Sequence, residues 1–185
     1  NTPHPTQPPP PTSTSEIPLS EAAQSEISPD PSPTSAGPIA TIALVQTTNR
    51  AFGVRRALEL LGRNPLRGNR VLLKPNYNSA DPAPASTHPD ILRTLIEEMK
   101  QMGARAITLG ERSGMGDTRQ VLEQTGVFTL ADEYGFDTVN FDELQENDWV
   151  LHQSADHHWQ SGFPVPRILL DTESFVQTCN LKTHR

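Results

Sequence analysis

Short apolar segments alternate with amphipathic segments from residue 39 onward, and this alternation limits the chain to few folds. The run Ile39–Val45 is rich in β-branched residues and is typical of a buried strand. Similar apolar runs follow at Val71–Leu73 and Ala106–Leu109. We expect these three segments to be the central, buried strands of one sheet. Strands that alternate with helices over short connections favour a parallel arrangement.

Helix signals lie between these apolar runs. Asn49 is positioned to cap a helix that Gly62 ends, and Pro89 suits the first turn of a second helix that Gly103 ends. Asp117 suits the cap of a third helix. Further elements are expected, a short helix at 130–134 and strands near 138–141, 149–151, 168–170 and 175–178. The predicted fold class is α/β, a mostly parallel sheet with helices on both faces in Rossmann-like layering.

Residues 1–38 have a different composition. They hold eleven of the 18 prolines and no lysine, arginine or aromatic residue. Such a segment buries too little apolar surface to offset the entropy of ordering it, so we expect a disordered Pro/Ser/Thr-rich tail or linker. No basic residue flanks Pro8–Pro11, which disfavours a PxxP ligand. Tails of this composition are common in exported bacterial proteins. This favours an extracytoplasmic location, with a cytoplasmic one as the alternative.

Residues 39–185 are expected to form one α/β domain. In parallel sheets, ligands bind outside the carboxyl ends of the strands. This directs attention to four loops that follow predicted strands and gather polar residues: 46–49, 74–88, 110–117 and 180–184. The concentration of polar side chains there is the main indication of a site.

The loop after the second strand begins with Lys74 and Asn76, which together present a cation and an amide to an anion. The alternative is a lysine that leaves the sheet into water and an asparagine that shapes a turn. Further along, the hydroxyl of Thr87 could cap the next helix, whose free N–H groups favour an anion. His88 is a candidate acid–base group, although a histidine at a cap is more often structural.

The loop at 110–117 most resembles a phosphate-binding loop. Ser113, Gly114 and Gly116 lie between a strand and a helix N-terminus, where backbone N–H groups can bind an anion. The loop lacks the Gly-Lys-Ser/Thr of a Walker motif and the full G-x-G-x-x-G spacing. Glu111 and Asp117 flank it, so a bound cation is as reasonable as a phosphate, and the metal is left unknown.

A last polar cluster follows the final predicted strand. Asn180 and Thr183 are candidate ligand-binding residues, and Lys182 and His184 are candidate catalytic residues. In an extended segment, the side chains of Lys182 and His184 point to the same face. We expect Lys74, Glu111 and Lys182 to meet at one edge of the sheet.

Composition excludes several classes of protein. One cysteine among 185 residues cannot support an iron–sulfur cluster built from this chain alone. No apolar run has the roughly 18 residues that a membrane-spanning helix needs. The formal charge is −7 with no basic block, which argues against nucleic acid as a partner.

Several segments together resemble the family called domain of unknown function 362. They are "VLLKPNYNSADP", "STHPDILRTLIEEMKQMGA", "GERSGMGDTRQVLEQTGV" and "NLKTH", in order across roughly residues 39–185. The resemblance implies a prokaryotic source and no established general reaction. Many members carry a ferredoxin-like pair of four-iron clusters, which this chain lacks, and others are exported. Members continue past the "LKTH" motif, so we expect the domain to extend beyond Arg185.

Three hypotheses about function remain open. The first is an enzyme or ligand-binding domain for a small anionic substrate, with Lys74 and Lys182 as the cations and His88 or His184 as the acid or base. The second is a non-catalytic extracytoplasmic subunit that engages protein partners through its tail or through a region beyond Arg185. The third is an electron-transfer accessory whose clusters belong to another chain.

Overall fold

The computed structural model describes residues 40–153 and 158–181, so the predicted tail at 1–38 lies outside the described residues. Within these described residues, five α-helices and six strands follow one another, with two 3-10 helices after the third strand. In chain order they are α1 (Arg50–Leu61), β1 (Arg70–Lys74), α2 (Pro89–Gln101), β2 (Ala106–Glu111), α3 (Thr118–Gln124), α4 (Val127–Tyr134), β3 (Asp137–Asn140), η1 (Phe141–Glu143), η2 (Glu146–Asp148), β4 (Trp149–His152), β5 (Phe163–Pro166), α5 (Arg167–Asp171) and β6 (Ser174–Gln177).

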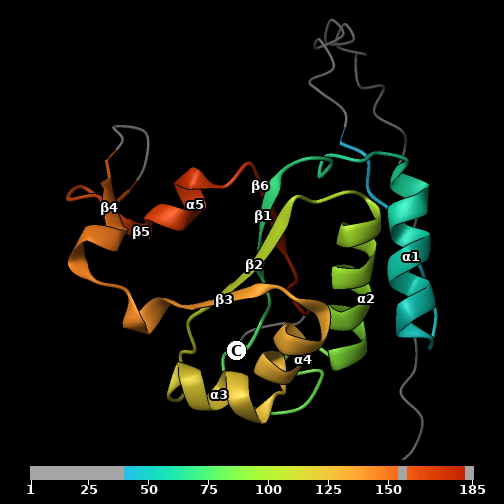
Figure 1. The fold of residues 1–185 in the computed structure, drawn as a ribbon, viewed down its shortest axis with the longest axis horizontal. Coiled ribbons are helices and arrows are strands. Elements are labelled where there is room, and N and C mark those ends of the chain that lie inside the picture. The colour runs from blue at the N-terminus through green and yellow to red at the C-terminus, as the bar shows by residue number, and fades with distance from the viewer. Residues whose placement is uncertain (1–39, 154–157, 182–185) are drawn as a thin grey trace, which may run out of the picture. The chain divides into compact units, whose positions relative to one another are not determined.

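Four of the strands form a parallel sheet in the order β3-β2-β1-β6. Val71 of β1 lies opposite Ile107 of β2 on one side and Ser174 of β6 on the other. β4 and β5 form a separate antiparallel pair. The predicted α/β class is therefore confirmed, with α1, α2 and α4 on one side of the parallel sheet and α5 on the other (Figure 1).

The direction of winding reverses at β1. From β1 the chain passes through α2 to β2, and through α3 and α4 to β3, moving toward one edge of the sheet. It then returns past β4, β5 and α5 to place β6 on the opposite side of β1 (Figure 1). The carboxyl ends of β1 and β6 therefore flank a topological switch point, the place where open parallel sheets bind ligands.

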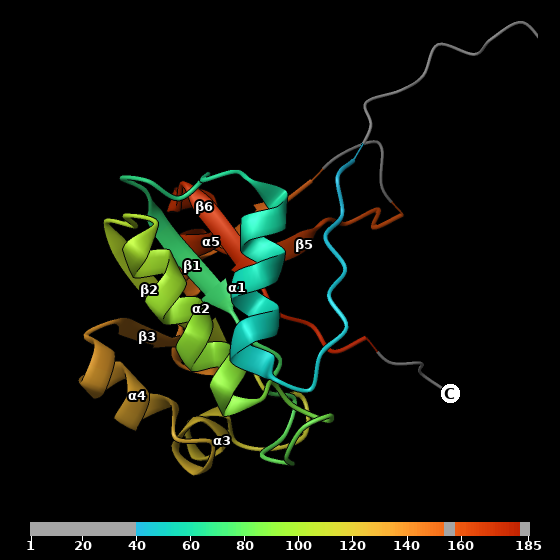
Figure 2. The same ribbon diagram turned by 90° about the vertical axis from the view of Figure 1, so that its right-hand side faces the viewer.

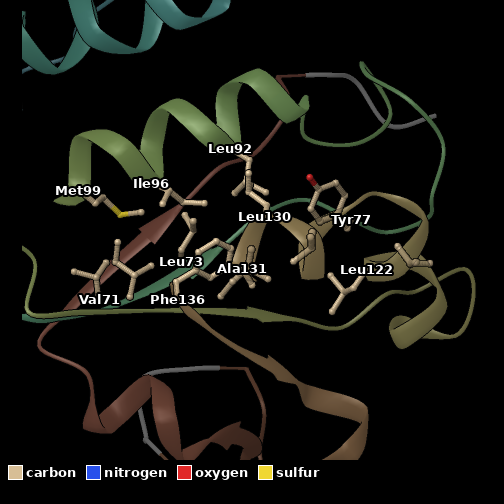
Figure 3. Close-up of a cluster of buried hydrophobic side chains, with 14 of the residues drawn as sticks. Val71, Leu73, Tyr77, Leu92, Ile96, Met99, Leu122, Leu130, Ala131 and Phe136 are labelled. Carbon is tan, nitrogen blue, oxygen red and sulfur yellow. The ribbon is translucent and has the colours of Figure 1, made fainter. Parts of the chain in front are cut away.

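The main core lies between the sheet and its helices. Alternate residues of β1, Val71 and Leu73, face α2 and α4, and pack with Ile96 and Leu130 (Figure 3). α1 and α2 run beside each other in front of the sheet (Figure 2). Arg55 joins the two helices through ion pairs with glutamates of α2. A hydrogen bond from the N–H of Thr87 to the carbonyl of Asn76 places the start of α2 near the carboxyl edge of the sheet.

The opposite face of the sheet needs a glycine. Leu72 is fully buried there, and Gly110 of β2 lies against the ring of Phe141 in η1. A Cβ at Gly110 would lie 2.4 Å from the Cζ atom of Phe141, so only glycine lets the ring approach the strand this closely. This contact packs the first residue after β3 against β2.

The caps of α1 and α3 agree with the sequence signals. The side chain of Asn49 accepts a hydrogen bond from the N–H of Phe52, and Gly62 ends α1 in the left-handed conformation with φ 60°. Asp117 caps α3 by accepting from the N–H of Gln120. These caps depend on local hydrogen bonds, which is why the sequence predicts them well.

The segment Ile39–Val45 is not the central strand that the sequence predicts. Its described part, residues 40–45, forms no strand, and the side chains of Ile42 and Leu44 are 86% and 92% exposed. The physical reason is that β1 already pairs with β2 on one edge and with β6 on the other. No backbone edge of β1 is left for this segment.

The region after β3 also differs from expectation. Residues 168–170 were expected to form a strand and lie instead in α5. β5 has no counterpart among the predicted strands, because Pro164 and Pro166 remove two backbone donors and disfavour a strand by sequence rules. β5 tolerates both prolines because it pairs on one side only, with β4.

Candidate functional site

The carboxyl ends of β1 and β2 bring a lysine and a glutamate into contact. Lys74 ends β1 and Glu111 ends β2, and the ammonium of Lys74 forms an ion pair with the carboxylate of Glu111. The Glu111 side chain is 1% exposed, whereas that of Lys74 is 26% exposed. The pair therefore lies at the edge of the sheet, with the Glu111 carboxylate buried and the Lys74 ammonium partly open to solvent.

Backbone groups hold the Glu111 carboxylate in place. One oxygen accepts from the N–H of Tyr77 at 2.9 Å, and the other accepts from the N–H of Arg112 at 2.8 Å as well as from Lys74. Hydrogen bonds to an ionised carboxylate offset the cost of burying it. Glu111 is therefore a fixed anion at the base of the site.

The ammonium group of Lys74 has one N–H donor that no described residue uses. An ammonium group has three N–H donors. Among the described residues, Lys74 donates to the carboxylate of Glu111 and, at 2.9 Å, to the backbone carbonyl of Pro75. The third N–H has no acceptor in the part of the chain that the structure describes. A ligand at this edge could accept from it.

Hydrogen bonds between Asn76 and Thr87 join the two ends of the loop at residues 74–88. The N–H of Asn76 donates to the hydroxyl oxygen of Thr87, and the N–H of Thr87 donates to the carbonyl of Asn76, both at 2.9 Å. The Asn76 amide also donates to the carbonyl of Ala85 at 3.1 Å. Both side chains, which the sequence suggested as ligand-binding, are thus engaged within the protein.

The sequence suggests Thr87 as the cap of α2, but in the structure the cap is His88. Nδ1 of His88 accepts from the N–H of Asp90 at 3.1 Å, while the hydroxyl of Thr87 serves Asn76. A ring nitrogen that accepts a hydrogen bond carries no proton, so the proton of the neutral ring lies on Nε2. His88 therefore presents an N–H donor outward from the start of α2.

The glycine-containing loop after β2 uses its N–H groups within the protein. The N–H of Ser113 donates to the hydroxyl of Thr118 at 2.8 Å, and that of Gly114 donates to the side-chain oxygen of Asn78 at 3.1 Å. The hydroxyl of Ser113 donates to the carbonyl of Tyr77 at 2.7 Å. These groups are not free for an anion in this structure, because they dock the loop onto residues 77–78.

Gly114 is required for this docking. A Cβ at Gly114 would lie 2.4 Å from Oδ1 of Asn78, so the loop and the asparagine could not approach as they do. Asp117 accepts from the N–H of Gln120 as the cap of α3, and Gly116 lies just before it. Ser113 and Gly114 therefore support the 74–78 segment, whereas Asp117 caps α3.

The last described residues return to the same edge. The amide of Asn180 donates to the carbonyl of Ser86 at 3.0 Å and to that of Pro84. Lys182, Thr183 and His184 lie outside the described residues, so their convergence with Lys74 stays a prediction. Asn180 nevertheless brings the end of the described chain against the loop that also holds Thr87.

The sequence analysis did not select Tyr77. Its side chain is 1% exposed, and its hydroxyl has no hydrogen-bond partner among the described residues. Burial, together with the nearby charge of Glu111, raises the pKa of Tyr77 to about 12. The only sequence signal was its place within the loop that starts at Lys74.

The described parts of the chain contain neither a cluster of metal-ligating side chains nor a helix that could span a membrane. In residues 40–153 and 158–181, no group of three or more His, Cys, Asp or Glu side chains is arranged to hold a metal ion. No helix within these ranges has the length and apolar character needed to cross a bilayer.

Comparison with known proteins identifies a family. No curated protein and no solved structure matches the sequence. A family model described as "Domain of unknown function (DUF362)" matches residues 71–185, which is more than half of the chain. The match begins at the second residue of β1 and includes Lys74, His88, Glu111 and Asn180. The chain therefore belongs to the DUF362 family.

Proposed function

We propose that this chain binds a small anionic ligand or substrate at the carboxyl edge of its sheet, with Lys74 as the cation that contacts it. The observation that carries the proposal is the arrangement of Lys74, whose ammonium is held by buried Glu111 and retains an unused N–H donor. The edge is the switch point between β1 and β6, where ligands bind in open parallel sheets.

The pairing with Glu111 does not cancel the attraction of Lys74 for a second anion. The N–H groups of Tyr77 and Arg112 already stabilise part of the negative charge on the carboxylate. Lys74 is held in one position, so a ligand spends little entropy on ordering it. A hydrogen bond to a charged group contributes about 1.5–3 kcal/mol, which corresponds to weak binding by Lys74 alone. Further groups are needed for tight binding, and Lys182 and His184 are the candidates.

The test uses inorganic phosphate as the probe and follows amide resonances of the 185-residue chain by NMR. Phosphate should shift the resonances near Lys74, and Lys74→Met should weaken its binding about tenfold or more. Lys100→Met is the matched control, because Lys100 lies near the other end of α2 and donates to the carbonyl of Tyr134. Equal phosphate affinity in the Lys74→Met and Lys100→Met variants would contradict the proposal.

A second variant separates binding from folding. Lys74→Met leaves Glu111 without its ammonium partner and lowers stability, so its fold is checked by the same amide spectrum. Lys74→Arg keeps the charge and the ion pair. It should retain most of the affinity for phosphate, whereas a loss equal to that of Lys74→Met would show that the shape of the edge, not its charge, binds the ion.

Export, and partner binding through residues 1–38, are further proposals that depend on the composition of that segment. They concern residues outside the described ranges. Fractionation of the cells that produce the protein tests the first, and cross-linking of chains with and without residues 1–38 tests the second. Recovery of the protein only with cytoplasmic contents would contradict export.

A further inference from the structure

The hydroxyl of Tyr77 lacks an acceptor in the described protein. It is buried without a hydrogen-bond partner among the described residues, and the phenol, whose pKa is raised to about 12, is a donor at neutral pH. Nearly all buried polar groups in folded proteins have a partner, because an unpaired one costs free energy. We therefore expect the hydroxyl to donate to an acceptor that is not one of the described residues.

Tyr77 forms part of the walls of two neighbouring surface depressions. One has a volume of about 370 Å³ and extends along residues 80–83, and the other, of about 270 Å³, lies between α2 and α4. Both share Tyr77, Pro89 and Thr125. The Tyr77 oxygen points toward the first turn of α2, close to Leu92 (Figure 3). Tyr77 thus lies where the two depressions meet.

The larger depression is rich in donors. Arg50, at the start of α1, lines it and forms no ion pair with a described residue. His88 lines it too; its Nδ1 accepts from the N–H of Asp90 and lies 3.6 Å from the Asp90 carboxylate, which leaves Nε2 as the nitrogen that can donate to a ligand. The acid in its wall, Asp81, already accepts from the hydroxyl of Ser79 at 2.7 Å. Arg50, His88 and Tyr77 thus offer three donor side chains, against the single carboxylate of Asp81 among the lining residues.

The rest of the lining is mostly apolar or already bonded, and it also includes Gln124. Ala80, Pro82, Ala83 and Pro89 contribute aliphatic surface. The hydroxyl of Thr125 donates to the carbonyl of Val121 at 2.7 Å within its own helix. A ligand that fits this surface has a negatively charged acceptor at one end and a compact apolar body.

We propose that the depression beside Tyr77 binds a small organic carboxylate. Its oxygens accept from the Tyr77 hydroxyl and from Arg50, and its apolar body lies against the alanines and prolines of residues 80–83. The hydroxyl is sealed from bulk solvent, so the ligand enters as this surface loop shifts, a local opening that costs far less than unfolding. Lys74 does not line the depression, and the proposal is independent of the phosphate site.

Benzoate is the probe, because it combines a carboxylate with a compact apolar ring. Titrated into the 185-residue chain by NMR, it should shift the amide resonances of residues 80–89 and 124–126. Tyr77→Phe and Arg50→Ala should each weaken binding about tenfold, the usual effect of losing a hydrogen bond to a charged group. Arg56→Ala, a change on the same helix at an arginine paired with Glu59, should leave binding unchanged.

The melting temperature without benzoate gives a second readout. Tyr77→Phe should leave it unchanged or raise it, since the hydroxyl has no hydrogen bond to lose. A clear fall would mean that an ordered water already satisfies the hydroxyl, and it would overturn the inference. So would the absence of saturable benzoate binding, or equal affinity in Tyr77→Phe, Arg50→Ala and Arg56→Ala.

The proposed phosphate site and the proposed carboxylate site can be tested independently of each other. Lys74→Met should weaken the binding of phosphate and leave that of benzoate unchanged, while Arg50→Ala should do the reverse. Loss of both responses in either variant would show that phosphate and benzoate share one site, which would also overturn the independence of this pocket.

Discussion

The hydroxyl of Thr87 lies 3.1 Å from the hydroxyl of Thr178, although the two residues are 91 positions apart. Thr178 follows β6, and its N–H also donates to the carbonyl of Lys74 at 3.0 Å. Thr87 in turn closes the 76–87 loop through Asn76. This contact therefore connects the ends of β1 and β6 and holds both sides of the switch point in register.

Replacing either threonine by valine should measure this connection. Thr87→Val leaves the N–H of Asn76 without its acceptor, so we expect a loss of about 1–3 kcal/mol in the free energy of unfolding. Thr178→Val removes only the hydroxyl contact and should cost about 0.5–1.5 kcal/mol. Urea unfolding gives both values. A larger loss for Thr178→Val than for Thr87→Val would mean that Asn76 has another acceptor.

Glu111 should be more important to stability than any exposed acid. Glu111→Gln keeps the shape but places an amide against the donors of Lys74, Tyr77 and Arg112, so at least one N–H loses its acceptor. We expect a loss of about 2–4 kcal/mol by urea unfolding. Glu59→Gln, which weakens an exposed pair with Arg56, should cost less than about 0.5 kcal/mol. Similar losses in both variants would argue against a buried carboxylate at this edge.

Tyr77 should make stability fall at alkaline pH. Its pKa is raised from 10.0 to about 12 in the folded chain, so the unfolded chain loses this proton first as the pH rises. The contribution is fully present below pH 10.0 and is lost as the pH approaches 12, by at most about 3 kcal/mol. The measurement is the urea midpoint of wild type and Tyr77→Phe across this range. Parallel curves for the two proteins would contradict the raised pKa.

Leu44 and Leu73 should respond very differently to substitution. Leu44 is 92% exposed, so Leu44→Ser should change the free energy of unfolding by less than about 0.5 kcal/mol. Leu73 is fully buried in β1, and Leu73→Ala should cost about 2–5 kcal/mol. Thermal or urea unfolding measures both. A loss of several kcal/mol for Leu44→Ser would instead support the buried strand that the sequence predicts for residues 39–45.

Local sequence determined most of the secondary structure around the site. The strand at Val71–Leu73 and the helix that begins at Pro89 follow from apolar runs, caps and glycine stops, which act over a few residues. The same signals placed Lys74 and Glu111 directly after strands, and parallel pairing of β1 with β2 then put both at one edge. Neighbouring parallel strands end on the same side, so this part of the site was predictable.

Only the tertiary structure decided which strands pair and which polar groups remain unpaired. Residues 39–45 look like a core strand, yet β6, from the far end of the chain, takes the free edge of β1. Ser113 and Asn180 look like ligand-binding residues, yet their partners are distant carbonyls at Tyr77 and Ser86. Hydrogen bonding and strand pairing between distant segments depend on how the whole chain packs. Local sequence patterns therefore cannot predict which of two candidate segments pairs with a strand.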